Sequence, residues 1–391
     1  MTLTPIQRTA RAPADAALYV PREWELAPLR RDVALDLLRG LAVLVLVVNH
    51  IHLESVLEYA TATVLSAAEV LVGVSGIVVA MVHRRRWAAA GPRAVTGMLL
   101  RRARKLYLAS VAVVAICGAL TAVPALQTEA LTVSPGMDAQ RDLYAFDGAA
   151  RTIVAVVTLE AGPWQFSILG LFIALLALTP ALLWMLARGL WPLVVAASWL
   201  AFLAGRELGV DVLPTQSERP FPLLVWQLLF VHGLVAGWHR RRISQAVGPR
   251  RRLAGFAVAA TGLACASALV AAELLVDDAA WAAWRDTHFD KGSLDLLRVV
   301  AMASVAGALY VAMRWRAASA ERLLGPVLLP LGRNSFYVFI VHVFVCLAVA
   351  SVPVLAGGGV GPLGNALVQA ACVTAIWAMA SRGVLFRWIP R

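Results

Sequence analysis

The stretch "RGLAVLVLVVNH", residues 39–50, decides the class of fold. It is an apolar run with an ionisable side chain at each end, Arg39 at one and His50 at the other. Eleven residues make close to three helical turns, so both side chains lie on one face, about 16 Å apart along the axis. Asp36 precedes Arg39 by one turn on that face. Ionisable groups in a membrane helix normally face the protein interior or a wet cavity, so the stretch predicts a membrane helix with a functional face.

The composition extends this reading to the whole chain. The 391 residues are 60% hydrophobic, with a mean hydropathy of +0.75, which is too apolar for a water-soluble protein of this length. We therefore predict an all-α fold, a polytopic integral membrane helical bundle with about ten transmembrane helices. The predicted spans are 33–54, 63–83, 103–124, 165–187, 190–205, 221–238, 253–275, 294–313, 327–350 and 362–382.

The charge distribution predicts the orientation. The net charge is +12, and the basic residues form short blocks between apolar segments, such as "HRRR" at 239–242. With ten spans, most of the 35 basic residues fall on one side, which the positive-inside rule places in the cytoplasm together with both termini. The apolar segment 150–162 is short, and we interpret it as interfacial or re-entrant. If it spanned the membrane, the topology downstream would invert.

The same pattern predicts the domain limits. We expect a cytoplasmic N-terminal tail at 1–32, a transmembrane domain at 33–383 and a cytoplasmic C-terminal tail at 384–391, in a multi-pass protein of the plasma (inner) membrane. All four cysteines lie in apolar segments, so we predict buried small hydrophobes and neither a disulfide framework nor a metal site.

The second predicted span adds a carboxylate. "SAAEVLVGVSGIVVA", residues 66–80, places Glu69 about two turns from the outer end. A short outer loop joins the first two spans, so we expect Glu69 at the depth of His50. A carboxylate beside an imidazole fixes its tautomer and raises its basicity, which makes His50 a candidate general base and Glu69 its partner. Gly73 and Gly76 would let a neighbouring backbone or a ligand approach closely.

Other polar groups fall in later spans. "GRNSFYVFIVH", residues 332–342, ends on His342, a further candidate for the site. At its cytoplasmic end are three residues that we predict to act on the donor side together with Arg39 and Asp36, namely Arg333, Asn334 and Ser335. Arg298 is a second further candidate, but it could equally pair with Asp295 three residues before it. The structural alternative for the first span is an Asp36–Arg39 ion pair.

The predicted outer loops combine acidic and aromatic residues. The loop 276–293 carries four aspartates together with Trp281, Trp284 and Phe289. Carboxylates accept hydroxyl protons and flat rings stack on sugar faces, so the loop fits a carbohydrate. The alternative is an ordinary polar loop with interfacial tryptophans.

Several of these segments together resemble a known family. An arginine, ten residues and a histidine in the first span resemble the acyltransferase-3 superfamily, and the closer likeness is to its OpgC family. The similar segments run in order through residues 30–350: "RDVALDLLRGLAVLVLVVNHI", "AAEVLVGVSGIVVAMVH", "VWQLLFVHGLVAGW", "DKGSLDLLRVVAMA" and "LGRNSFYVF". One departure is "PWQFSILGLF" at 163–172, where the family often reads "LPLY".

The resemblance implies a function. OpgC-type proteins are similar to enzymes that move an acyl group, succinyl in the founding case, from cytoplasmic acyl-CoA to a hydroxyl of an extracytoplasmic glycan of the cell envelope. The expected partners are acyl-CoA as donor substrate, an extracytoplasmic polysaccharide or oligosaccharide as acceptor, and membrane lipids, with no nucleic acid and no bound cofactor. Two alternatives stay open: a non-enzymatic carrier or flippase for a lipid-linked sugar, and an acyltransferase for a lipid or small molecule.

Overall fold

The computed structural model describes residues 31–61, 66–133, 142–210, 212–213, 220–276, 278–356 and 358–389. Most of the predicted N-terminal tail and the last two residues of the predicted C-terminal tail lie outside these ranges.

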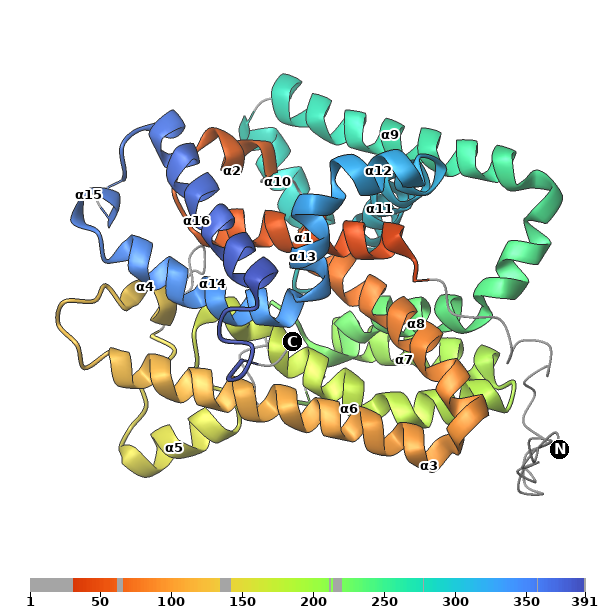
Figure 1. Cartoon of the computed structure of the whole chain (residues 1–391), viewed down its shortest axis with the longest axis horizontal. Helices are drawn as coiled ribbons and strands as arrows, with labels where there is room; N and C mark the ends of the chain where they lie inside the picture. Colours follow the sequence, from red (N-terminus) through yellow and green to blue (C-terminus); the bar gives the residue numbers. More distant parts are fainter. Residues whose placement is uncertain are drawn as a thin grey trace, which may run out of the picture.

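The described residues form helices and no β-strand (Figure 1). In chain order the helices are α1 (Val33–His50), α2 (Val56–Thr61), α3 (Ala67–Leu120), α4 (Glu129–Thr132), α5 (Ala149–Val157), the 3-10 turn η2 (Trp164–Phe166), α6 (Ser167–Ala187), α7 (Trp191–Glu207), α8 (Leu223–Ala246), the 3-10 turn η4 (Gly248–Arg250), α9 (Arg251–Leu275), α10 (Asp278–His288), α11 (Leu296–Trp315), α12 (Ala317–Leu323), α13 (Gly325–Arg333), α14 (Ser335–Ala350), α15 (Pro353–Ala356) and α16 (Pro362–Arg382).

The all-helical fold is confirmed, but the count of ten spans is not. Nine of the predicted spans each overlap one helix or one arm of a helix, and the span 327–350 covers two helices, α13 and α14. Within the described ranges, six helices are long and apolar enough to cross a membrane, or up to seven if α13 and α14 together make one broken span. The helical part of the segment 150–162 belongs to the nine-residue α5, which is about 14 Å long and therefore too short to cross a bilayer by itself.

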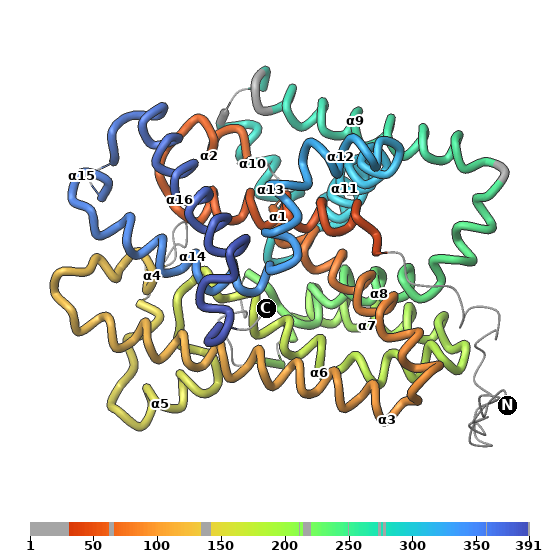
Figure 2. The backbone as a smooth tube through the Cα atoms, viewed as in Figure 1, coloured from red at the N-terminus to blue at the C-terminus, as the bar shows by residue number. Residues whose placement is uncertain are grey.

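The second and third predicted spans are the two arms of α3. The arms meet at a sharp bend (Figure 2), where Gly91 has φ +80° and Pro92 follows. Glycine adopts positive φ without steric cost, and proline removes a backbone donor, so the sequence itself specifies the bend.

Helix α1 lies inside the bundle and contacts α3, α11, α13, α14 and α16. Its start is fixed by Asp32, whose carboxylate accepts hydrogen bonds from the backbone amides of Ala34 (3.1 Å) and Leu35 (3.4 Å). Tyr310 of α11 and Arg240 of α8 bond the same carboxylate, so three helices meet where α1 begins.

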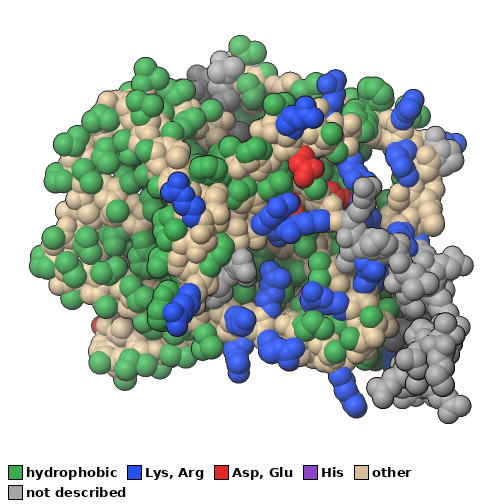
Figure 3. All heavy atoms as spheres, in the orientation of Figure 1, with side chains coloured by type: hydrophobic (Ala, Val, Ile, Leu, Met, Phe, Trp, Pro, Cys, Tyr) green, Lys and Arg blue, Asp and Glu red, His purple; other side chains and the backbone are tan. Residues whose placement is uncertain are grey.

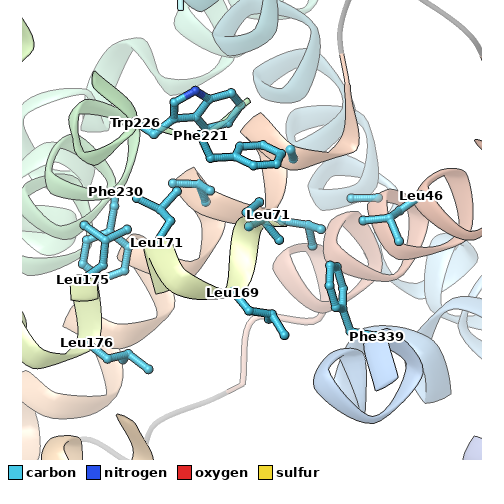
Figure 4. Packing of buried hydrophobic residues seen from close by; sticks show 14 of the residues in the cluster. Leu46, Leu71, Leu169, Leu171, Leu175, Leu176, Phe221, Trp226, Phe230 and Phe339 are labelled. Atoms are coloured by element: carbon cyan, nitrogen blue, oxygen red, sulfur yellow. The ribbon is translucent and has the colours of Figure 1, made fainter. Parts of the chain in front are cut away.

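The apolar core includes residues of α1, α3, α6, α8 and α14, among other helices (Figure 4). Leu46 of α1, Leu71 of α3, Leu171 of α6, Trp226 of α8 and Phe339 of α14 are all buried in it. This core holds the first arm of α3 beside α1, and so it sets the relative positions of the polar groups described below.

Close backbone contact joins α3 to α8. A side chain added at Gly76 would collide with the carbonyl of Phe230, and one at Gly233 would collide with the carbonyl of Gly73. The prediction that Gly73 and Gly76 permit close approach is confirmed, and the neighbour is the backbone of α8.

The predicted span 327–350 is broken. Helices α13 and α14 meet at an angle of 92° on either side of Asn334. Broken helices occur at membrane depth where the freed backbone is buried in protein or lines a cavity. The break lies at three of the predicted donor-side residues, Arg333, Asn334 and Ser335.

Candidate functional site

A large cavity opens beside the first half of α1. Its volume is about 640 Å3. Seven basic side chains line it: Arg39, His83, Arg86, Arg101, Arg102, Lys105 and Arg333. Among the residues that the structure describes, no carboxylate lines it, and the other polar lining residues are Ser75 and Ser335. We call it the basic cavity; Figure 3 shows Lys and Arg gathered where α1 begins and α3 bends, while the left margin is mainly hydrophobic.

Arg39 is held at the wall of this cavity by two contacts. Its Nε donates to the carbonyl of Gly332 over 2.6 Å, and its Nη2 lies 3.2 Å from the carboxylate of Asp36. Arg31 also bonds Asp36, and Arg333 lies 4.0 Å from it. Three arginines therefore surround the carboxylate of Asp36, and the predicted Asp36–Arg39 pair is confirmed. Arg39 also lines the basic cavity.

The break between α13 and α14 completes the wall. Arg333 and Ser335 line the basic cavity, whereas the Asn334 side chain donates to the carbonyl of Pro330 over 2.9 Å. Helix α14 begins at Ser335, and a helix N-terminus favours anions. Of the five predicted donor-side residues, the structure places Arg39, Arg333 and Ser335 on the cavity, with Asp36 behind them.

A pair of histidines lies at the other end of α1. The Nδ1 of His50 is 2.9 Å from the Nε2 of His342 on α14, and His342 is fully buried. The ring of Trp164 packs edge-on against His50, with 4.9 Å between centroids, and against His52 at 5.6 Å. The imidazole of His50 is therefore oriented by another imidazole and by an indole.

Glu69 makes a different contact from the predicted one. Its carboxylate lies 2.5 Å from the guanidinium of Arg298 and accepts from the hydroxyl of Ser66 at 2.6 Å. Both side chains of the Glu69–Arg298 pair are buried. No hydrogen bond joins Glu69 to His50 in the part of the chain that the structure describes, so the expectation of a carboxylate beside this imidazole is corrected.

The alternative pairing of Arg298 with Asp295 is also corrected. Asp295 instead lies 2.6 Å from Arg206 of α7. Arg298 instead points toward α3, where its Nε donates to Glu69. Its Nη1 donates to the carbonyl of Phe289 over 2.8 Å.

Three residues near the histidines escaped the sequence analysis. Trp164 and His52 flank His50. Lys291 is electrostatically close to His50 and Glu69, and its ammonium lies 4.6 Å above the ring of Phe221. Burial lowers the pKa of Lys291, against the opposing effect of Glu69. The "DKGSLD" segment and the departure "PWQF" were the only sequence signals for them.

An apolar partition separates the two ends. Val43, Leu71 and Phe339 line the inner part of the basic cavity. Phe339 also contacts His342, at 5.1 Å between ring centroids, and Phe166, at 5.8 Å. The cavity therefore approaches the histidine pair and stops one aromatic ring short of it.

The four cysteines take no part in either end. All four thiols are free, and Cys117 and Cys346 are buried. The Sγ of Cys346 lies 3.2 Å from the carbonyl of His50, so it packs against the end of α1.

The long apolar helices and the ionisable groups held inside them define the class: an integral membrane protein with an internal polar site. A family model described as OpgC protein matches residues 31–388. The chain therefore belongs to the OpgC family, whose members are membrane acyltransferases that act on glycans. No curated protein and no solved structure was similar enough to the chain to count as a match.

Proposed function

We propose that this protein transfers an acyl group, succinyl-like, from cytoplasmic acyl-CoA to a hydroxyl of an extracytoplasmic glycan in the plasma (inner) membrane. One observation carries the proposal. A basic cavity at one end of α1 and a histidine pair at the other lie in one bundle, about three helical turns apart.

The donor end suits a phosphorylated carrier. Coenzyme A carries a diphosphate and a 3′-phosphate, and arginine binds such groups through bidentate, charge-assisted hydrogen bonds. The basic cavity offers arginines from three elements, α1, α3 and α13, with no carboxylate among its lining residues. The apolar inner part, which ends at Phe339, suits the pantetheine arm and the acyl chain that follow the phosphates.

The histidine end suits removal of a hydroxyl proton. One of the two facing nitrogens must donate in the His50–His342 contact. If His50 Nδ1–H donates to His342 Nε2, the Nε2 of His50 is left unprotonated and can act as the base. His342 is then the positioning residue that holds this tautomer, the role that the sequence analysis gave to Glu69.

In the proposed transfer step His50 acts first as the base and then as the acid. Its Nε2 takes the proton of the acceptor hydroxyl while the oxygen attacks the thioester carbonyl carbon. The C–S bond breaks, the thiolate of coenzyme A leaves, and the imidazolium returns the proton to that sulfur. The products are an ester of the glycan and free coenzyme A.

The acceptor side is supported by aromatic rings on α10. Trp281 and Trp284 stack at 5.3 Å, and Trp284 stacks on His288 at 4.9 Å. Trp284 is 41% exposed, so part of this stack is accessible from outside. Flat, partly exposed rings of this kind suit the apolar face of a sugar.

The proposal fixes an orientation that can be measured. Cysteines introduced at residue 10, within 276–293 and after Arg391 should label as inside, outside and inside, because the basic end of the bundle belongs in the cytoplasm. An external C-terminus with an internal N-terminus would contradict this orientation.

The donor assignment is tested with purified protein and acyl-CoA. We expect release of free thiol that depends on added glycan, with the acyl group recovered as a glycan ester by mass spectrometry. An intact thioester after incubation with active protein would remove acyl-CoA as the donor. The Arg39→Lys variant should bind acyl-CoA about 10-fold more weakly or worse, since lysine cannot reproduce a bidentate contact.

Arg31→Lys is the matched control for Arg39→Lys. Arg31 bonds the same carboxylate of Asp36, but its side chain is 57% exposed and does not line the basic cavity. Equal loss of acyl-CoA binding in both variants would show that Arg39 acts only through Asp36.

A further inference from the structure

A second pocket lies apart from the basic cavity. Its volume is about 290 Å3. The residues that line it come from α3, the end of α6, the turn after it, the start of α7 and α8: Arg84, Leu186, Arg188, Gly189, Trp191, Trp238, His239 and Arg242. We call it the α6–α7 pocket. It shares no lining residue with the basic cavity. Arg84 lines the α6–α7 pocket, whereas its neighbours His83 and Arg86 line the basic cavity.

The α6–α7 pocket gathers positive charge without an acidic side chain. Three arginines and a histidine line it, and none of the described residues that line it carries a carboxylate. Arg242 and Arg241 lie near enough to Arg84 to repel its charge. Arg188 lies 4.0 Å above the ring of Trp184 and makes no ion pair within the described part of the chain. Arg188, in the positive potential of this pocket, would be stabilised by a bound anion.

An unsatisfied donor or acceptor points to a ligand in the same place. The Nε2 of His239 is buried and has no hydrogen-bond partner among the described residues. Buried polar atoms are nearly always hydrogen-bonded, so an unpaired one at the wall of a pocket marks a missing partner. The ring of Trp191 packs edge-on to His239, with 6.0 Å between centroids, which holds the imidazole at the pocket.

The surface beside the pocket is apolar. Leu190, Trp191 and Leu193 are 38%, 44% and 56% exposed on the first turn of α7 and just before it. Gly189, at φ +77°, makes the tight turn that brings Arg188 and these side chains to the same place. In an integral membrane protein, exposed leucine and tryptophan beside arginine are typical of the boundary between hydrocarbon and headgroups.

We propose that the α6–α7 pocket binds the phosphate of an anionic glycerophospholipid, whose acyl chains lie against Leu190, Trp191 and Leu193. Basic pockets between membrane helices bind lipid headgroups by this chemistry. The proposal is independent of the acyl-transfer function, since neither the histidine pair nor the basic cavity contributes to it.

The test uses the full chain, stripped of lipid in an uncharged detergent and titrated with phosphatidylglycerol, phosphatidylcholine or inorganic phosphate. Native mass spectrometry counts bound lipid, and thermal unfolding reports stabilisation. We expect phosphatidylglycerol to bind and stabilise the protein, and the other two to have little effect. Arg188→Gln should weaken phosphatidylglycerol binding about 10-fold, the effect of losing one charge-assisted contact.

Arg252→Gln is the matched control, because it removes the same charge from an exposed position on α9 outside the pocket. If both variants bind phosphatidylglycerol equally weakly, the lipid is attracted by the overall positive charge and not by a defined site, and the proposal is overturned. Equal binding of phosphatidylcholine would do the same. Protection by inorganic phosphate as strong as that by the lipid would assign the pocket to a soluble anion. Arg188 is exposed, so unchanged melting of Arg188→Gln without lipid shows that it folds.

Discussion

Replacing His50 with alanine is expected to abolish acyl transfer, with a loss of about 100-fold to 10,000-fold in turnover. His50 lies beyond Phe339, which closes the inner end of the basic cavity, and its ring is oriented by both His342 and Trp164. Alanine removes the base and leaves the donor end unchanged. The measurement is the rate of glycan ester formation at saturating acyl-CoA, together with the affinity for acyl-CoA, which should stay at the wild-type value.

His232→Ala is the control for this loss. His232 is also a histidine inside a helix of the bundle, but its Nδ1 meets the carbonyl of Leu228 at 2.8 Å and its ring packs on Trp199. We expect this variant to keep most of its activity. A folded His50→Ala protein that retains more than about a tenth of wild-type turnover would exclude general-base catalysis by this residue.

Removing Glu69 is expected to destabilise the protein strongly, by about 3–5 kcal/mol of unfolding free energy. Glu69→Ala leaves Arg298 as an uncompensated charge in the bundle, because both side chains of the pair are buried. Replacing both partners with apolar residues, Glu69→Leu with Arg298→Met, should recover most of the loss, since neither charge then remains. Reversible denaturation in detergent measures each value.

The exposed pair between Arg151 and Glu160 provides the comparison. Their closest atoms are 2.6 Å apart, but the Arg151 side chain is 44% exposed, so Arg151→Ala should cost only about 0–1 kcal/mol. The double variant at 69 and 298 also separates two roles for Glu69. Recovered stability with recovered activity assigns Glu69 to the fold, and recovered stability without activity assigns it to the chemistry, as the sequence first suggested.

The helices could be predicted because a membrane helix is specified by a continuous run of apolar residues. Apolar runs of sufficient length located α6, α9, α11 and α16 to within a few residues. The alignment of Arg39 and His50 on one face follows from helical periodicity alone. Local signals also explain the bend in α3, where Gly91 and Pro92 stand between two apolar runs.

The pairing of the polar groups could not be predicted, because it depends on contacts between distant segments. His50 and His342 are 292 positions apart, and Glu69 and Arg298 are 229 apart. The sequence analysis paired His50 with Glu69, and Arg298 with Asp295, because these partners are closer in sequence. The break at Asn334 was hidden for a related reason: the apolar run 327–350 satisfies a hydropathy criterion whether or not the helix is continuous.

The contact between Arg39 and Gly332 has a consequence for how the sequence can vary during evolution. The group that accepts from Arg39 Nε is a main-chain carbonyl, and no codon change can delete it. Variation at position 332 acts only through bulk, because any side chain there would collide with the backbone of α1 at Asp36 and Gly40. This contact of Arg39 is therefore tolerant of substitutions in the surrounding side chains as long as position 332 stays glycine, whereas the second contact of Arg39 depends on the side chain of Asp36.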